Sequence, residues 1–420
     1  MTLLLAAGAA LRLFYVSFTE SRALGEAYNV AAALADGRGF ADAYHAGQGA
    51  TAHVTPITPG IAAAVYSIFG TGSVVSETIL GCWSIGLALA TYFLLYGAFG
   101  RLGVPAILRL GALAFLCLVP VYFWPETVDF RVWDGGLAAC LTALLFNRMM
   151  ATQEISVRQT WPLAVIAALL FFVNPVWGVA GYLCVTIYCL ARVPLTRTFL
   201  VAAVAALALV AVVGPWAIRN AIVMDRPVLL RSNSGLELAL AMHPAAVDTT
   251  DPGGTFMKRL REIHPTMGSA PYRAMKAAGG EASYANELGR ETWRWIGAHP
   301  AAAATLAVRH IRQAIFPDGW QFSALGGSER GGRLRAYLIR TLATLGVVGI
   351  ALMLVSRRSS WIYPAILIVV PAMEMAFFQP VQRYTYLSYP LLVFAASGCV
   401  MMLIDLRRRR RYQVSSEGMV

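Results

Sequence analysis

The sequence predicts an all-α polytopic membrane protein of about ten transmembrane helices, with outer-face loops and amphipathic juxtamembrane helices. Hydrophobic residues make up 58% of the 420 residues and charged residues only 13%, whereas a typical soluble domain is about 25% charged. The mean hydropathy is +0.61. Apolar runs close to the roughly 20 residues that cross a bilayer recur along the chain.

The apolar runs define ten expected spans in chain order. The first lacks the basic start and the cleavage site of a signal peptide, and Arg12 interrupts it, so we expect it to be retained as a helix. The ten expected spans are residues 2–18, 74–99, 104–123, 133–151, 160–174, 175–192, 198–218, 336–355, 361–379 and 385–406.

The fifth and sixth spans share one apolar run, which only Asn174-Pro175 interrupts. We interpret this pair as a tight turn between two short helices, because proline disfavours helix at and before its own position. Ten spans place every short basic loop on the side of the N-terminus, as the positive-inside rule requires. A single kinked helix would leave nine spans and put Arg407–Arg411 on the wrong face. We therefore expect both termini to be cytoplasmic and the protein to lie in the cell inner membrane.

This topology divides the chain into four parts and places two loops and one long segment on the outer, periplasmic face. The parts are a transmembrane module at 1–218 with outer loops 18–72 and 124–134, an outer-face segment at 219–335, C-terminal spans at 336–406 and a basic cytoplasmic tail at 407–420.

The outer-face segment carries its own helical signals. Apolar residues recur at helical spacing over 283–298, and a second amphipathic stretch over 299–317 has Pro300 at a helix start. We expect both helices on or near the bilayer surface. The stretch "DTTDPGGTF" at 248–256 predicts a loop.

The net charge indicates the class of partner, and the cysteines indicate whether the fold contains disulfides. The formal net charge is +12, which fits cytoplasmic loop charge and anionic lipid head groups, or an anionic substrate. Nucleic acid is excluded as a partner because the arginines are scattered between apolar spans. All six cysteines lie in apolar segments, so we expect small core residues and no disulfide framework.

Carboxylates at the membrane surface are the first candidates for chemistry. One or two of them in a surface pocket can serve as a general base or hold a divalent cation such as Mg²⁺ or Mn²⁺. The alternative is that they are solvated loop charges or helix caps. For Asp36, which precedes Gly37, we favour a helix cap. The acids of the first two outer loops are Glu20, Glu26, Asp36, Asp42, Glu126, Asp129 and Asp134. The candidate metal ligands among them are Glu26, Glu126 and Asp129.

Two histidines and two arginines complete the candidates. His45 and His53 are eight residues apart, a spacing that does not diagnose a metal site, so we expect hydrogen bonds to substrate. Arg219 and Arg383, the latter followed by Tyr384, lie at the outer ends of spans. A guanidinium offers a planar fork of donors that suits phosphate, and the alternative is a snorkelling anchor.

The motifs "YNVAAALADGRGF" (28–40) and "TAHVTPITPG" (51–60) resemble the first outer loop of bacterial polyprenyl-phosphate-sugar-dependent glycosyltransferases of the GT-C superfamily. This superfamily includes the protein O-mannosyltransferases and the aminoarabinose transferase of lipid A. "PWAIRN", "SNSGLEL" (232–238), "WIGAHPAAAATLAVRHIRQAIFP" and "QRY" follow in the family's order, so the resemblance covers most of the chain.

The resemblance implies transfer of a sugar from a polyprenyl-phosphate donor to a glycan, lipid or protein acceptor at the outer face, with inversion of the anomeric centre. It implies that Tyr28 and Asn233 contact the substrate, in addition to His45 and His53. It also implies that Arg219 and Arg383 compensate the charge of the phosphate. The family commonly has an aspartate three to five residues before the tyrosine. Here that window holds no acid. Glu26, two residues before Tyr28, is the only acid that could substitute at a shifted register, and it is our candidate base.

Three other classes remain open from the residues alone. A lipid or oligosaccharide flippase or transporter would carry ionisable residues within its spans, and Glu374 is the best example here. An O-antigen ligase or polymerase also uses a large outer loop with arginines. A non-catalytic scaffold would have no cavity that the outer loops share.

Overall fold

The computed structural model describes residues 1–18, 24–151, 157–192, 194–224, 226–323 and 328–405. Within these ranges the regular elements are helices, with one isolated β-bridge between Ala41 and Ala50. Glu20 and the basic tail at 407–420 lie outside the described residues.

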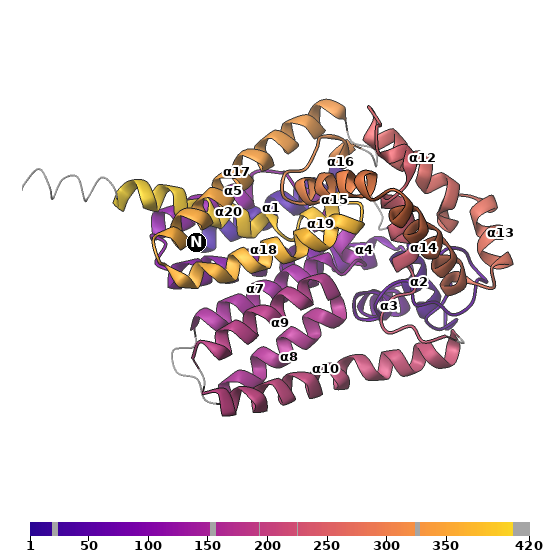
Figure 1. The fold of residues 1–420 in the computed structure, drawn as a ribbon, viewed down its shortest axis with the longest axis horizontal. Coiled ribbons are helices and arrows are strands. Elements are labelled where there is room, and N and C mark those ends of the chain that lie inside the picture. Colours follow the sequence, from indigo (N-terminus) through magenta and orange to yellow (C-terminus); the bar gives the residue numbers. More distant parts are fainter. Residues whose placement is uncertain (19–23, 152–156, 193, 225, 324–327, 406–420) are drawn as a thin grey trace, which may run out of the picture.

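The helices fall into an apolar bundle and a set of shorter elements beside it (Figure 1). The bundle helices are α1 (Thr2–Phe18), α4 (Val74–Arg101), α5 (Ala106–Leu118), α7 (Gly135–Ala151), α8 (Val157–Val173), α9 (Pro175–Leu190), α10 (Leu195–Val223), α17 (Glu329–Val355), α18 (Ile362–Glu374) and α20 (Tyr389–Ala395). The other α-helices are α2 (Glu26–Ala35), α3 (Ile57–Phe69), α6 (Phe123–Thr127), α11 (Ser234–Ala241), α12 (Pro252–Ile263), α13 (Ser269–Ala277), α14 (Glu281–Ala298), α15 (Pro300–Ile315), α16 (Trp320–Ser323) and α19 (Gln382–Thr385). The 3₁₀ turns are η1 (Asp129–Arg131), η2 (Pro244–Ala246), η3 (Pro265–Met267), η4 (Ser359–Trp361) and η5 (Met375–Phe377).

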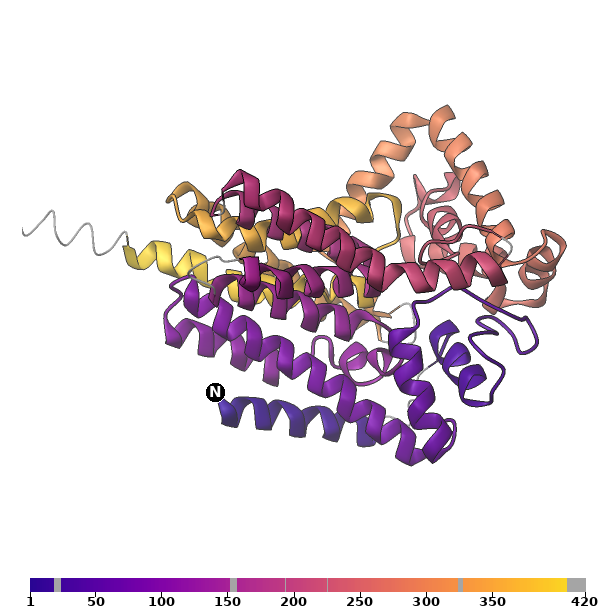
Figure 2. The same ribbon diagram turned by 90° about the horizontal axis from the view of Figure 1, so that it is seen from below.

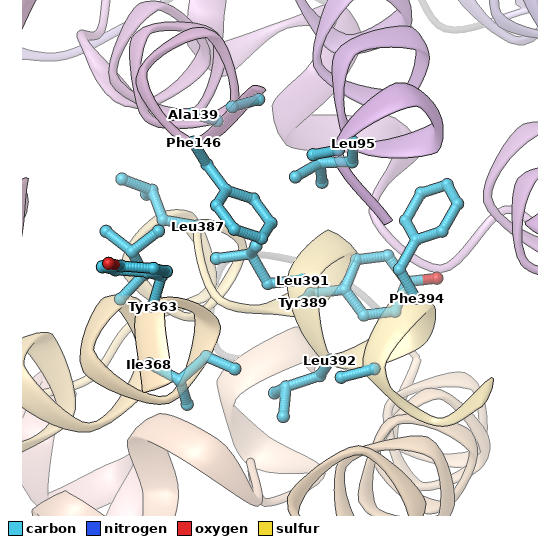
Figure 3. Close-up of a cluster of buried hydrophobic side chains, with 14 of the residues drawn as sticks. Leu95, Ala139, Phe146, Tyr363, Ile368, Leu387, Tyr389, Leu391, Leu392 and Phe394 are labelled. Carbon is cyan, nitrogen blue, oxygen red and sulfur yellow. The ribbon is translucent and has the colours of Figure 1, made fainter. Parts of the chain in front are cut away.

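The bundle core lies where α4, α7, α18 and α20 meet (Figure 3). Leu95, Phe146, Leu391 and Phe394 point toward one another there and are at most 2% exposed. Helix pairs α4–α7, α8–α9, α8–α10 and α17–α20 pack along the bundle. Burying such side chains stabilises the packing by about 1.5–3 kcal/mol each in water.

Every predicted span contains an apolar helix, but the number ten is not confirmed by helix length. Among the described residues, four helices are long and apolar enough to cross a membrane, and a pair bent by 75°, Ala106–Leu118 with Phe123–Arg131, would make a fifth. The four are Val74–Arg101, Leu195–Val223, Glu329–Val355 and Ser359–Phe377. The other five expected spans hold shorter apolar helices, Thr2–Ser17, Gly135–Ala151, Thr160–Val173, Pro175–Leu190 and Tyr389–Asp405.

The predicted turn at Asn174-Pro175 is confirmed. Helix α8 ends at Val173, and α9 begins at Pro175. The Asn174 side chain caps α9 by accepting a hydrogen bond from the amide of Trp177 at 3.3 Å. The chain therefore reverses here, and α8 and α9 pack against each other.

The first outer loop is more ordered than its polar composition indicated. Residues 18–72 include α2 and α3, which pack together around Val30, Ala62 and Tyr66. Asp36 caps the C-terminus of α2 and Gly37 follows with a φ of 76°, as expected for a helix end. The sequence indicated only the helix end at Asp36, and helix α3 was not predicted because it is too short to resemble a span.

The outer-face segment confirms the two amphipathic helices as α14 and α15, with Pro300 in the first turn of α15. The prediction of a loop over 248–256 is wrong for its second half, because α12 begins at Pro252. Asp251 caps that helix by accepting a hydrogen bond from the amide of Gly254 at 2.9 Å. The Asp-Pro pair is thus a helix start and not a turn.

The short outer helices gather at one end of the bundle. In both ribbon views α2, α3 and α12–α14 lie at this end, while the N-terminus and the helix that ends at Asp405 lie at the other (Figures 1 and 2). The first outer loop and helices α12–α14 of the outer-face segment therefore share one end of the molecule.

Candidate active site

Glu26, His53 and His264 form a buried cluster at the outer-helix end. Each offers one possible ligand atom, and these atoms all lie within 4.8 Å of one another. In the part of the chain that the structure describes, this is the one group of three or more His, Cys, Asp or Glu side chains so placed. Two imidazoles and one carboxylate are a donor set that suits Zn²⁺ or Mn²⁺ better than Mg²⁺.

Glu26 is aimed into the cluster by the start of α2. Gly25 precedes it with a φ of 93°, a conformation that favours glycine, and Glu26 is the first helical residue. The Thr266 hydroxyl donates to Oε1 of Glu26 at 2.7 Å, and Nε2 of His264 lies 3.5 Å from the same oxygen. The carboxylate at the displaced register therefore does reach a polar site.

Tyr44 orients both histidines. Its hydroxyl lies 3.0 Å from Nδ1 of His53, which leaves Nε2 of that ring for a ligand. The Tyr44 ring packs edge-on against His53 and His264, with centroids 5.1 and 5.6 Å away. A partner on the second ring nitrogen is the usual support of a metal-binding histidine.

The protonation of the cluster favours a carboxylate and a neutral imidazole. Burial alone would raise the pKa of Glu26, but the charges of His264 and His53, the helix-start amide and Thr266 outweigh it and lower the pKa to about 2. Burial lowers the pKa of His53 to about 3, with Glu26 opposing and His264, Arg231 and Arg383 adding to the effect. Metal ligands need these forms.

Acidification should destabilise the fold around His53. Because the folded-state pKa of His53 is about 3 against its usual 6.5, the unfolded chain binds more protons between those values, and stability falls as the pH drops through this window. Glu26 adds a loss between its usual 4.5 and about 2. Thermal unfolding at pH 7.5 and 5.0 should show a smaller loss for His53→Gln than for the wild type; equal losses would contradict this assignment.

A cavity of about 410 Å³ has no cluster residue in its wall, but two of its wall residues interact electrostatically with the cluster. Its polar wall includes Arg231, Asn233 and Glu237. The charge of Arg231 helps to lower the pKa of His53, and the charge of Glu26 helps to raise the pKa of Glu237. Its apolar wall comes from the ends of α9 and α18, and Tyr384 closes it on the side of α19. The apolar residues are Pro175, Val176, Trp177, Leu229, Leu230, Ala314, Pro371, Ala372, Met375, Phe378 and Leu387.

Two guanidinium groups keep unused donors here: Arg231, which lines the cavity, and Arg383, which precedes the lining residue Tyr384. Arg231 pairs with Asp134 at 2.7 Å, and Arg383 stacks on the ring of Trp133 at 4.4 Å. The Nε atom of each is buried and has no hydrogen-bond acceptor among the described residues. Buried donors are normally satisfied, so an anion bound here would complete both groups.

The structure brings some of the predicted residues to this cavity and leaves others elsewhere. Asn233 and Tyr384 line it, with Arg383 next to Tyr384. Arg219 instead donates to the carbonyls of Thr51 at 2.6 Å and Phe40 at 2.8 Å, so it supports the first outer loop.

Tyr28 and His45 also lie away from the cavity wall. Tyr28 packs edge-on against Tyr66, with ring centroids 5.8 Å apart. Nε2 of His45 lies 3.1 Å from the carbonyl oxygen of Pro265, and its ring packs on Tyr272 at 4.3 Å. Their contacts are therefore with other parts of the outer-face fold.

The proposed metal set of Glu26, Glu126 and Asp129 is not assembled; the cluster pairs Glu26 with histidines instead. Glu126 is 1% exposed and forms an ion pair with Arg12 at 2.7 Å. Asp129 accepts a hydrogen bond from the indole of Trp124 at 3.1 Å. Both acids are occupied by partners that the sequence pattern could not reveal.

Sequence reasoning missed His264, Arg231 and Glu237. His264 follows α12 in a stretch without a motif, and its only signal is that it is one of six histidines in the chain. Arg231 and Glu237 flank or lie within the "SNSGLEL" motif, from which only Asn233 was selected.

No protein-family model and no curated protein matches the sequence. Among solved structures, the chain is similar to the archaeal oligosaccharyltransferase AglB from Archaeoglobus fulgidus in complex with an inhibitory peptide and a dolichol-phosphate, at 13% identity and a TM-score of 0.50. The match covers 98% of this chain and 51% of AglB, so the chain spans about half the length of that protein. A second similar structure is ArnT from Cupriavidus metallidurans bound to undecaprenyl phosphate, at 14% identity, a TM-score of 0.40, and coverage of 94% and 77%.

The likeness to AglB shows the fold. The chain shares the helical architecture of this oligosaccharyltransferase.

Proposed function

We propose that this protein is a membrane glycosyltransferase that moves a sugar from a polyprenyl-phosphate donor to a glycan, lipid or protein acceptor at the outer face of the cell inner membrane. The observation that carries the proposal is the pair of unsatisfied arginine donors, on Arg231 and Arg383, beside an apolar cavity at the ends of bundle helices. A lipid phosphate has an anion for the arginines and a hydrocarbon chain for the apolar wall. The dolichol-phosphate bound to AglB belongs to the same chemical class.

The topology of the bundle supports an outer-face site. The N-terminus and the end of the last described helix lie at one end, and the cluster lies at the other with α2 and the outer helices (Figure 1). The charge rule places the basic loops, and so both termini, in the cytoplasm.

In this proposal Arg231, Arg383 and Tyr384 bind the donor phosphate, and Arg219 supports the first outer loop. The polyprenyl chain follows the wall formed by Trp177, Pro371 and other apolar residues. Asn233 and Glu237, which lie 3.4 Å apart between Nδ2 and Oε1, offer polar groups to the sugar. Of the predicted substrate contacts, His53 serves the cation site instead, and Tyr28 and His45 lie away from the cavity wall.

Glu26, His53 and His264 would hold a divalent cation, with Zn²⁺ or Mn²⁺ the best match to their donor atoms. When bound, such an ion supplies positive charge that polarises a coordinated oxygen and stabilises the departing phosphate. Tyr44 holds His53 in the orientation that leaves Nε2 free.

Transfer is a single displacement at the anomeric carbon. The acceptor hydroxyl oxygen forms the new bond, the bond from the anomeric carbon to the phosphate oxygen breaks, and its electron pair leaves with the polyprenyl phosphate. Glu26 takes the hydroxyl proton and passes it to water, because a carboxyl with a pKa near 2 does not retain it. A base this weak contributes little, so charge stabilisation at the phosphate is the larger effect, and the anomeric centre is inverted.

Mass spectrometry of lipid-linked sugars tests the proposed function. A deletion strain should accumulate one polyprenyl-phosphate sugar and lose one sugar from a glycan, lipid or protein, and wild-type protein should restore both. Unchanged levels of lipid-linked sugars would overturn the proposal. Accumulation of the donor on the inner leaflet alone would instead favour a flippase.

Replacing Arg231 by lysine should weaken binding of undecaprenyl phosphate by about 10-fold, since hydrogen bonds to a charged group contribute about 1.5–3 kcal/mol. Lysine keeps a positive charge beside Asp134 but loses the guanidinium fork. Native mass spectrometry with undecaprenyl phosphate, and with neutral undecaprenol as the comparison lipid, measures the effect. Arg226→Lys, at an exposed position, is the control, and equal affinities for both lipids in the wild type would contradict a phosphate site.

A further inference from the structure

Glu281, the first residue of α14, is a buried carboxylate that accepts four hydrogen bonds. It is 4% exposed. Oε1 accepts from the amide of Ala52 and the hydroxyl of Ser232, both at 2.7 Å. Oε2 accepts from the hydroxyl of Thr51 at 2.7 Å and from the side-chain amide of Gln48 at 2.8 Å. Four donors saturate a carboxylate, so Glu281 has no capacity left for a ligand.

The four donors come from the two segments that lead into the candidate active site. Gln48, Thr51 and Ala52 belong to the first outer loop directly before His53. Ser232 lies between Arg231 and Asn233, which both line the cavity. The amide of Ser232 also donates to the carbonyl of Ala52 at 3.0 Å, so the two segments are joined by their backbones as well.

Thr51 transmits this contact to His53. Its hydroxyl oxygen accepts a hydrogen bond from the amide of His53 at 3.1 Å while donating to Glu281. Its carbonyl accepts from Arg219 at 2.6 Å on the other side. The backbone that enters His53 is therefore held from two directions.

Helix α14 is itself fixed, and it holds His264 as well. Gly235 of α11 lies so close to α14 that an added Cβ would be 2.0 Å from the carbonyl oxygen of Ala285. Tyr284, one turn after Glu281, donates from its hydroxyl to the carbonyl of Ile263 at 2.9 Å, next to His264. One helix thus anchors the segments that carry both histidines of the cluster.

We propose that Glu281 is a positioning residue, which fixes His53 relative to His264 and Arg231 so that a divalent cation and a lipid phosphate can be bound side by side. This inference rests on the proposed function. Without the carboxylate, the buried donors of Thr51, Ala52 and Ser232 lose their common acceptor, and the loop before His53 gains freedom. Supports of this kind typically change metal affinity by about 10–100-fold.

Zn²⁺ titration calorimetry on the purified full-length protein tests the inference. Glu281→Gln and Thr51→Val should each weaken Zn²⁺ binding by about 10–100-fold. Thr51→Ser keeps the hydroxyl and should bind Zn²⁺ as the wild type does. Glu287→Gln, an exposed carboxylate on the same helix, is the matched control and should also be unchanged.

Two further readouts separate positioning from loss of fold. Thr51→Val is isosteric, so it keeps the inference testable if Glu281→Gln does not fold, and thermal unfolding identifies folded variants. The effects of Glu281→Gln and Thr51→Val should be strongly non-additive, because both break one interaction.

The outcomes distinguish a failure of this inference from a failure of the metal role of the cluster. Folded Glu281→Gln and Thr51→Val proteins with wild-type Zn²⁺ affinity would overturn the inference and leave the proposed function standing. A wild-type protein that binds neither Zn²⁺ nor Mn²⁺ would overturn both the metal role of the cluster and the inference that rests on it.

Discussion

Replacing His264 by alanine should lower the affinity of the protein for Zn²⁺ by more than about 100-fold. Loss of a residue that only supports a ligand lowers metal affinity by at most about 100-fold, so a larger loss identifies a ligand. His264 contributes one of three ligand atoms that lie within 4.8 Å of one another, and a site with two ligands cannot satisfy a tetrahedral ion. Sugar transfer should fall with metal binding if the proposed function holds. Calorimetry gives the affinity, and donor consumption measured by mass spectrometry gives the activity.

The His264→Ala experiment has a matched control on the same outer-face segment. His299 is exposed and its ring stacks on Trp295 with centroids 5.6 Å apart, outside the cluster. His299→Ala should therefore bind Zn²⁺ as the wild type does. If His264→Ala also retained full affinity, the cluster would not be the metal site, and Glu26 would have to act alone.

His264 could not be predicted from the sequence, because proximity to Glu26 is a tertiary property. Thr266, two residues after His264, donates a hydrogen bond to Glu26, and 240 residues separate Thr266 from Glu26 in the sequence. Sequence patterns can recognise ligands that share a helix face or a short loop, and these residues share neither. The family pattern indicated the first outer loop, which carries Glu26 and His53 of the cluster, but it gave no chemical reason to prefer His53 over His45.

The fold was easier to predict than the site, because hydropathy is a property of contiguous residues. Each of the ten expected spans contains an apolar helix, and Asn174-Pro175 was identified as a turn from local backbone chemistry alone. Of α2 only the end at Asp36 was predicted, and α3 was not predicted, for the opposite reason. They are short, and their stability comes from packing on each other around Ala62 and Tyr66, which a hydropathy window does not detect.

The acids of the second outer loop show the same limit. Glu126 and Asp129 stand at the mouth of a predicted span, so surface chemistry was a reasonable expectation. The ion pair with Arg12 cannot be inferred from spacing, since Arg12 is 114 residues from Glu126. Trp124 is only five residues from Asp129, but no motif marks the two as partners. A buried charge needs a partner, but the sequence does not say which one.

Replacing Glu126 by alanine should destabilise the protein by about 3–5 kcal/mol, the usual effect of leaving one member of a buried ion pair unpaired. Arg12 is fully buried and donates to Glu126 at 2.8 Å, with further bonds to the carbonyls of Gly8, Leu116 and Cys117. Tyr92 also donates to Glu126. Thermal unfolding in a mild detergent measures the loss, and Glu329→Ala, an exposed carboxylate in the first turn of α17, should cause little change.

The double variant Arg12→Met/Glu126→Met decides what Glu126 does. Removing both charges avoids the unpaired arginine, so stability should recover most of the loss, because hydrophobic replacement of a buried pair is often neutral. If the double variant is stable and still transfers sugar, Glu126 serves the packing of α1 on α6 and has no part in the chemistry. If it is stable but inactive, the Arg12–Glu126 pair contributes to the chemistry, and a purely structural role for this pair is wrong.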